Sequence, residues 1–243
     1  MENTSINGDC LEVMPNLPES FVDLILCDLP YSQTSCVWDK AILDPAELWK
    51  NWKRILKPGG TVILTTSGKF NIIMGASNLE WLQYDLIWKK PQATNPMHIS
   101  KRPGKAHENI LVFCEGTPYY NPQMTQGTPY KGFESKNGAT IGEAYGSGKS
   151  KHRDNPTGER FPLSVVEFGR ERSGPKHPTK KPLKLCEFLI KTFSKEGDIV
   201  FDCCSGVGSI GKAAKNTNRK YFLIEKEKSY YDIGVEWINS TSS

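Results

Sequence analysis

The feature that most constrains the fold of this chain is a repeated alternation of short apolar runs with amphipathic helical patterns. Residues 22–27 (VDLILC) form a nearly continuous apolar run, which is typical of a strand buried in a parallel sheet. Asp44 and Pro45 then open a helical pattern, because aspartate caps a helix and proline fits its first turn. The run 61–66 (TVILTT) follows, and the same rhythm returns with runs at 199–202 and 221–225. This alternation predicts an α/β fold with a mostly parallel, doubly wound sheet.

The remaining elements follow from the same patterns. Further strands are expected at 81–88 and 109–114, and helices at 45–56, 70–79, 182–193, 209–216 and 230–238. Residues 116–175 differ in kind, because they are rich in glycine and tyrosine and contain few aliphatic runs. They predict an irregular insertion with little core of its own. The expected organisation is one α/β domain whose halves, 1–115 and 176–243, are separated by the insertion 116–175.

Composition excludes several classes of protein. The sequence has no run of 18 apolar residues, and its N-terminus lacks a basic segment followed by an apolar one, so neither a membrane span nor a signal peptide is expected. The 7 cysteines are an odd number without a CxxC pair, and the 4 histidines are scattered. This usage suits reduced thiols inside a cell better than a disulfide framework, and no metal site is expected. The predicted location is therefore cytoplasmic.

Positive charge is concentrated in one stretch of the chain. Five cations and no carboxylate lie between Leu86 and His107, namely Lys89, Lys90, Lys101, Arg102 and Lys105. A patch of this kind attracts polyanions through release of their counterions. It is equally typical of an ordinary solvated face, so charge alone does not decide between the two.

The first motif with chemical content is Asp28-Leu29-Pro30-Tyr31, directly after the apolar run 22–27. Ligands of open α/β sheets bind beyond the carboxyl ends of the strands. At that place the Asp28 carboxylate and a backbone carbonyl near Pro30 would accept both N–H bonds of an exocyclic amine, and Tyr31 would stack on a flat base. Taken alone, a pattern of these four residues is more often only a strand that ends in a turn.

The second motif is the loop after the strand 199–202. Asp202 is followed by Gly206 and Gly208, which let the backbone approach a ligand closely, and Glu225 ends the next strand, where a carboxylate would hold a ribose diol. Residues 206–211 also read as GxGxxG, which is compatible with a nicotinamide-dependent oxidoreductase. However, Asp202 and three further residues separate the first glycine from the strand. A wide loop with a carboxylate favours a ligand that carries a positive amino group and no pyrophosphate.

Together the motifs resemble those of the β-class DNA amino-methyltransferases. That family combines a (D/N/S)PP(Y/F) tetrapeptide, a target-recognition insertion and a later FxGxG-type cofactor loop, in a circularly permuted motif order on a Rossmann-like sheet. Residues 28–31 (DLPY), the insertion 116–175 and residues 202–208 (DCCSGVG) follow this order. The segments 7–10 (NGDC), 107–113 (HENILVF), 177–182 (HPTKKP) and 221–234 (YFLIEKEKSYYDIG) resemble the family as well. The resemblance covers almost the whole chain outside the insertion.

The resemblance implies S-adenosylmethionine as the cofactor and double-stranded DNA as the partner. The resemblance is also compatible with a homodimer, and it implies a prokaryotic or phage source. In the catalytic site Asp28 and the Pro30 carbonyl would hold the target amine, and Tyr31 would stack on the flipped base. The implied cofactor residues are Asp202, Gly206 and Gly208 around the methionine, Glu225 at the ribose, Asp9 and Cys10 at the adenine, and Thr179 and Lys181 near the methionine. For Asp9, Thr179 and Lys181, plain turn and helix-start roles fit the sequence equally well.

Two departures and several alternatives accompany this interpretation. Leu29 replaces the usual first proline of the tetrapeptide, and Cys203-Cys204 replace a usual Pro-Phe in the cofactor loop. A non-catalytic nucleic-acid-binding relative is therefore one alternative. Methylation of cytosine N4 is another, because it needs nearly the same chemistry, although the family's cytosine enzymes mostly begin the tetrapeptide with serine and Asp28 favours adenine N6. Methylation of cytosine carbon 5 is set aside, because no cysteine of the chain follows a proline. These motifs do not separate DNA from RNA as the substrate.

Overall fold

The computed structural model describes residues 1–31, 43–94, 97, 99–132, 154–169, 174–175 and 180–240. The chain divides into two compact units, one made of Met1–Asn121 with Ser164–Ser243 and the other of Pro122–Leu163. The first unit is α/β, as the alternation predicted, and contains an eight-stranded sheet in the order β1-β10-β9-β2-β3-β5-β4-β8. Its neighbouring strands run parallel except on both sides of β5.

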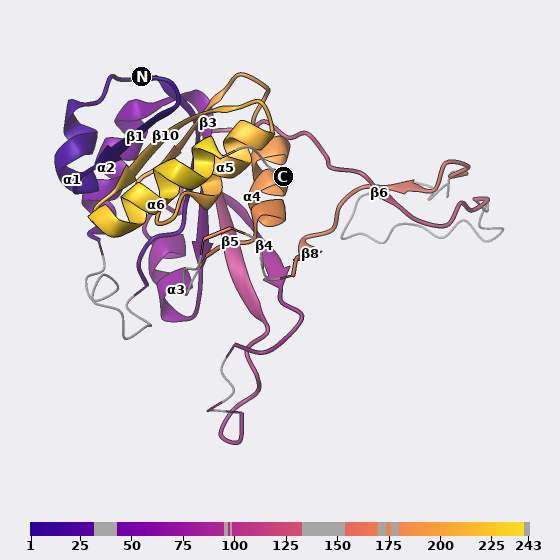
Figure 1. The fold of residues 1–243 in the computed structure, drawn as a ribbon. Coiled ribbons are helices and arrows are strands. Elements are labelled where there is room, and N and C mark those ends of the chain that lie inside the picture. The colour runs from indigo at the N-terminus through magenta and orange to yellow at the C-terminus, as the bar shows by residue number, and fades with distance from the viewer. Residues whose placement is uncertain are drawn as a thin grey trace. The chain divides into compact units, whose positions relative to one another are not determined.

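The strands of this sheet are β1 (Thr4–Asn7), β2 (Val22–Cys27), β3 (Leu56–Thr66), β4 (Leu82–Lys89), β5 (His107–Cys114), β8 (Val165–Glu167), β9 (Ile199–Asp202) and β10 (Lys220–Glu225). The helices are α1 (Cys10–Val13), η1 (Met14–Asn16), α2 (Pro45–Ile55), α3 (Lys69–Ala76), α4 (Leu183–Phe193), α5 (Ser209–Asn216) and α6 (Lys228–Asn239). In Figure 1 the yellow helix α6 lies beside β1 and β10, so the two ends of the chain meet at one edge of the sheet.

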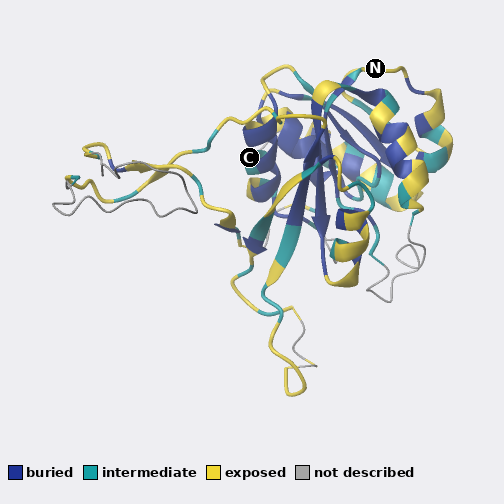
Figure 2. Ribbon diagram, turned by 180° about the vertical axis from the view of Figure 1, so that it is seen from behind, coloured by how far each residue is buried: buried dark blue, intermediate teal, exposed yellow. Residues whose placement is uncertain are grey.

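Helices cover both faces of the sheet, and the strands alternate between two apolar clusters. Leu24 and Leu26 point to the cluster formed with α4, α5 and α6, whereas Ile25 and Cys27 point to the one formed with α1, α2 and α3. This period of two is what a strand buried on both faces requires. Figure 2 shows the result as dark blue strands between helices whose outer sides are exposed.

Several predicted elements agree with the structure and some do not. The strands at 22–27 and 199–202 and the helix at 209–216 coincide with β2, β9 and α5. The expected helix 45–56 begins as predicted, with the Asp44 carboxylate accepting from the Ala46 N–H at 3.0 Å. Its end was wrong, because Leu56 is already extended and pairs with Val22 as the first residue of β3. The strands β1 and β8 were not predicted.

The second unit contains a short antiparallel pair, β6 (Thr125–Gln126) with β7 (Glu159–Arg160), and a bridge between Tyr130 and Asn155. The predicted insertion 116–175 extends beyond this unit at both ends, and β8 within it pairs with β4 of the main sheet.

The chain order around β2 creates a topological switch point. β2 lies between β9 and β3 in the sheet. From β2 the chain proceeds outward to β3, and from β9 it proceeds outward in the opposite direction to β10. In open α/β sheets the crevice at such a point binds the ligand. Asp28 follows β2 and Asp202 ends β9, so both predicted acidic residues lie at this crevice. The two strand ends touch, because the Sγ atoms of Cys27 and Cys203 lie 3.6 Å apart.

Candidate active site

Asp28 is held by three side chains that come from different parts of the chain. Its Oδ1 accepts a hydrogen bond from Thr65 Oγ1 at 2.6 Å and another from the Tyr31 hydroxyl. Its Oδ2 accepts from Lys181 Nζ at 2.6 Å. A carboxylate offers about four acceptor positions, so one remains for a further donor such as an amine.

Tyr31 has a fixed orientation beside Asp28. Its ring stacks on Phe70, with the centroids 4.9 Å apart and the planes at 30°. Its hydroxyl also lies 2.6 Å from the Thr65 carbonyl oxygen. Burial, together with the charges of Asp28 and Glu108, raises the pKa of the Tyr31 phenol well above its usual value. Tyr31 is therefore a neutral aromatic ring at physiological pH. The intervening Pro30 is half-buried.

Lys181 belongs to a buried network of charges. Its Nζ lies 2.6 Å from Asp28 Oδ2 and 3.4 Å from Glu108 Oε2. Glu108 also forms an ion pair with Lys90. Burial alone would lower the pKa of Lys181, but the charges of Asp28 and Glu108 outweigh it and raise that pKa. Burial likewise opposes ionisation of Glu108, yet Lys181 and Lys90 hold its pKa below the usual value. Glu108 and Lys181 are therefore both ionised at neutral pH. Their ion pairs place Lys181 beside Asp28. The position near the methionine of the cofactor, which the resemblance implied for Lys181, stays a prediction.

The loop after β9 is formed largely by backbone contacts. Asp202 is buried, its Oδ1 accepts from the Cys204 N–H at 3.0 Å, and burial raises its pKa to about 8. Gly208 has a φ of 80° as the N-cap of α5, a conformation that favours glycine. A Cβ on Gly208 would lie 2.8 Å from Ile238 Cδ1 of α6, so this glycine is needed for packing as well as for any ligand.

Glu225 connects the end of β10 to the same loop. Its Oε2 accepts from the Gly206 N–H at 2.6 Å and its Oε1 from the Glu227 N–H at 2.8 Å. Burial raises the pKa of Glu225, although these N–H groups oppose the change. Each oxygen keeps acceptor capacity for a hydroxyl group. The carboxyl oxygens of Asp202 and Glu225 and the glycine loop thus suit a cationic ligand with a ribose, whose positive charge would favour the ionised form of Asp202. The residues fit the expected cofactor.

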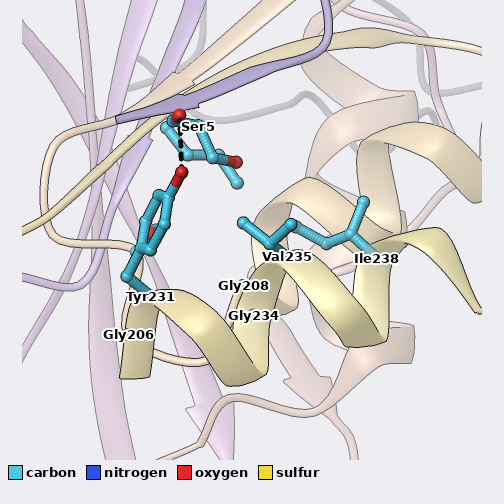
Figure 3. A pocket seen from close by; sticks show the side chains of 9 residues that line it. Ser5, Gly206, Gly208, Tyr231, Gly234, Val235 and Ile238 are labelled. Carbon is cyan, nitrogen blue, oxygen red and sulfur yellow. Dashed lines mark hydrogen bonds between the residues drawn. The ribbon is translucent and has the colours of Figure 1, made fainter. Parts of the chain in front are cut away.

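Figure 3 shows a small cavity on the α6 side of this loop. It is lined by residues of β1, the loop and α6, among them Ser5, Gly206 and Gly234, and Tyr231 donates a hydrogen bond to the Ser5 carbonyl at 3.3 Å. Its volume of about 10 Å³ admits roughly one water molecule. This cavity is therefore a packing gap behind the loop and has no room for a cofactor.

The other predicted cofactor residues are placed as follows. Asp9 caps α1, accepting from the Leu11 N–H at 2.9 Å, and pairs with Lys226 Nζ at 2.9 Å. This is the turn role that the sequence also allowed. Cys10 is buried at the start of α1, and hydrogen bonds from the Cys203 and Cys204 thiols lower its pKa. Thr179 lies outside the described residues.

The five predicted DNA-contacting cations fall into different environments. Lys101 and Arg102 are exposed in the segment between β4 and β5. Lys89 is exposed and pairs with Glu167 at 2.9 Å. Lys105 binds the Ser67 hydroxyl, and burial lowers its pKa. Lys90 has only 14% of its side chain exposed and binds Glu108, which favours a structural role over phosphate contact.

Comparison with known proteins identifies the chain. Residues 22–236 match the DNA methylase family N6_N4_Mtase, a span that includes every element from β2 to most of α6. The chain belongs to this DNA methylase family. The resemblance inferred from the motifs is thereby confirmed. The methylase is 31% identical over 263 residues to the Type II methyltransferase M.HinfI of Haemophilus influenzae, covering 95% of this chain and 67% of that protein.

Solved structures show that the methylase also has the expected fold. It superposes on M1.HpyAVI in complex with SAM with a TM-score of 0.65 and 22% identity, covering 96% of this chain and 98% of that one. PvuII DNA methyltransferase, which is cytosine-N4-specific, gives a TM-score of 0.69 at 17% identity, covering 100% of this chain and 88% of that one. The expected S-adenosylmethionine cofactor agrees with these findings. Within the described part of the methylase, no helix combines the length and apolarity needed to cross a bilayer.

Two residues of the methylase's candidate site were not predicted from sequence. Thr65 donates to Asp28 from the end of β3, and Glu108 on β5 holds Lys181 and Lys90. Glu108 stands inside a motif that resembled the family, but its partners are far away in the sequence. Thr65 is the penultimate residue of β3, a buried strand adjacent to β2, and its position near the carboxyl edge was the signal that could have identified it.

Proposed function

We propose that this methylase transfers a methyl group from S-adenosylmethionine to the exocyclic N6 of adenine in double-stranded DNA. The observation that carries the proposal is the meeting of two acidic corners at one switch point. Asp28 at the end of β2 has one acceptor position left, and the loop of Asp202 and Glu225 lies at the ends of the neighbouring strands. Membership of the DNA methylase family supports the reaction class.

The residues around Asp28 would do the chemistry by positioning. Asp28 and the Pro30 carbonyl accept the two protons of the target amine, which turns the nitrogen lone pair toward the methyl group. Lys181, Thr65 and the Tyr31 hydroxyl hold the carboxylate in place. The cofactor supplies a methyl group already activated on a sulfonium, so orientation and electrostatics provide most of the rate.

The target base must leave the duplex, at a cost of a few kcal/mol. Phe70 covers one face of Tyr31. Lys181 Nζ also lies over the ring, 5.6 Å from its centroid. A flipped base would stack on Tyr31 beside this ammonium group, which offsets about 1–3 kcal/mol. Lys101 and Arg102 would contact phosphates, and the insertion 116–175 would recognise the sequence, because specificity lies in contacts to base edges. A homodimer and an intracellular location remain predictions.

The choice of adenine depends on Asp28, because an ionised carboxylate polarises an amine more strongly than a serine hydroxyl does. Nucleoside mass spectrometry of DNA from cells that express the methylase tests it, with an Asp28→Ala strain as the control. We expect N6-methyl-2′-deoxyadenosine only in the strain that expresses the unchanged methylase. N4-methyl-2′-deoxycytidine in its place would show that the base assignment is wrong and leave the enzyme class unchanged. Neither product, from protein that binds the cofactor, would favour the non-catalytic relative.

A further inference from the structure

Four of the six cysteines that the structure describes meet at the start of the cofactor loop. Cys27 ends β2, Cys10 begins α1, and Cys203 and Cys204 follow β9. The Sγ atoms of Cys10, Cys203 and Cys204 all lie within 4.8 Å of one another. Cys10 and Cys203 are 6% and 2% exposed, and Cys204 is half-buried. The sequence had indicated reduced thiols without a metal site, because their spacing along the chain is unlike that of known metal motifs.

The geometry points to a site for one thiophilic d10 metal ion, Zn(II) in the cell, held by the thiolates of Cys10, Cys203 and Cys204. Zinc–sulfur bonds are about 2.3 Å long, which places sulfurs of a tetrahedral site about 3.8 Å apart. Three sulfurs already within 4.8 Å therefore reach that spacing by small side-chain movements. Thiolates select this class of ion over hard cations such as Mg²⁺.

The surroundings of the three thiols complete the site. The Cys27 thiol lies 3.6 Å from Cys203 Sγ, where its S–H can donate to the bound thiolate as a supporting contact. Three protein ligands leave a fourth position for water or another ligand, and Cys204 is the thiol with access to solvent. Binding would release one proton from each coordinating thiol that is protonated beforehand.

Cys203 and Cys204 stand where the family usually has Pro-Phe, so the site would be a property of this chain. It would fix the cofactor loop to α1 across the end of the sheet. Ion binding is measured without cofactor or DNA, so its outcome is independent of methyl transfer.

The test uses the full chain, purified with a phosphine reductant and freed of metal by a chelator. Titration with Cd(II) is followed by thiolate-to-metal charge-transfer absorbance, and Zn(II) stoichiometry by native mass spectrometry. We expect one ion per chain, at least a tenfold weaker affinity in Cys204→Ser, and no change in the matched controls Cys186→Ser and Cys114→Ser. Zn(II) should also raise the thermal midpoint of the wild-type protein, because an ion that binds only the folded state stabilises it.

Cys10→Ser gives the same test if Cys204→Ser does not fold, as judged by near-UV circular dichroism. Absence of the charge-transfer band would overturn the site. So would a band that persists in both variants, or a native mass that shows only a disulfide between these cysteines.

Discussion

The two neighbouring strands at the switch point, β2 and β9, both lead to an aspartate, but the two aspartates are held by different kinds of partner. β2 leads into Asp28, whose partners are side chains from β3 and from Lys181. β9 ends in Asp202, whose carboxylate accepts from the N–H of Cys204 two residues later. We refer to the first group, Asp28 with Tyr31, Thr65, Glu108 and Lys181, as the charged corner, and to residues 202–208 with Glu225 as the loop corner.

The difference shows how one edge of a sheet supports two kinds of site. In the charged corner ionised side chains neutralise one another, so removal of one partner leaves a buried charge unpaired. In the loop corner burial dominates, and it raises the pKa values of both Asp202 and Glu225. Changes in the charged corner should therefore affect turnover and pH dependence, whereas changes in the loop corner should affect affinity for the cofactor.

Asp28→Ala should give the largest effect and the sharpest separation of the two corners. Loss of the group that holds the amine should lower turnover about 1000-fold or more, equivalent to about 4 kcal/mol, because it acts in the transition state. The cofactor dissociation constant, measured by calorimetry, should stay within about threefold of wild type. Asp85→Ala, an exposed aspartate of β4, is the control. Substantial turnover in Asp28→Ala would remove Asp28 from the mechanism.

Glu225→Ala should show the opposite behaviour. Loss of the acceptor for the ribose hydroxyls should raise the cofactor dissociation constant about 10- to 100-fold, or about 1.4–2.7 kcal/mol. Turnover at saturating cofactor should change much less. Glu227→Ala removes an exposed carboxylate two residues away and should leave the constant unchanged. An unaltered constant in Glu225→Ala would mean that the ribose lies elsewhere.

The two corners also differ in how far they could be predicted from sequence. The loop corner is local, so the strand, the glycines and Asp202 could be found by pattern alone. Most of the charged corner is assembled across long distances, such as 153 residues between Asp28 and Lys181. Sequence motifs could name both residues but not their ion pair, because the sheet order brings them together. β1 and β8 were missed for a related reason, since each is short and is defined by its pairing partner.

Lys101 and Arg102 test whether cations outside the charged corner bind DNA. Both are exposed and, among the described residues, neither forms an ion pair, whereas Lys90 is paired with Glu108. The double reversal Lys101→Glu and Arg102→Glu should reduce the slope of log affinity against log salt by about 1.8, or about 0.9 per phosphate contact. Reversal of the exposed Lys184 and Lys191 on α4 makes the same charge change as a control. Equal salt slopes in the two double variants would mean that the DNA binds elsewhere. The DNA sequence that is methylated should be the same in all of these proteins.

Glu108→Gln should give the smallest effect, and its sign depends on pH. Lys181 and Lys90 hold the pKa of Glu108 below its usual 4.5, against the effect of burial. A carboxyl with a lowered pKa stabilises the folded state above its unfolded pKa, and this contribution is lost as pH falls through the folded pKa.

The variant should therefore lose about 1 kcal/mol of unfolding free energy at pH 7, because glutamine keeps hydrogen bonds but not the charge. The difference from wild type should shrink as pH falls below 4.5. Urea denaturation across this range measures it, with the exposed Glu80→Gln as the control. A difference that stays constant from pH 7 down to well below 4.5 would show that the Glu108 charge contributes nothing. Glu108 would then hold Lys181 and Lys90 by hydrogen bonds alone, and the charge of the corner would reside in the ion pair of Lys181 with Asp28.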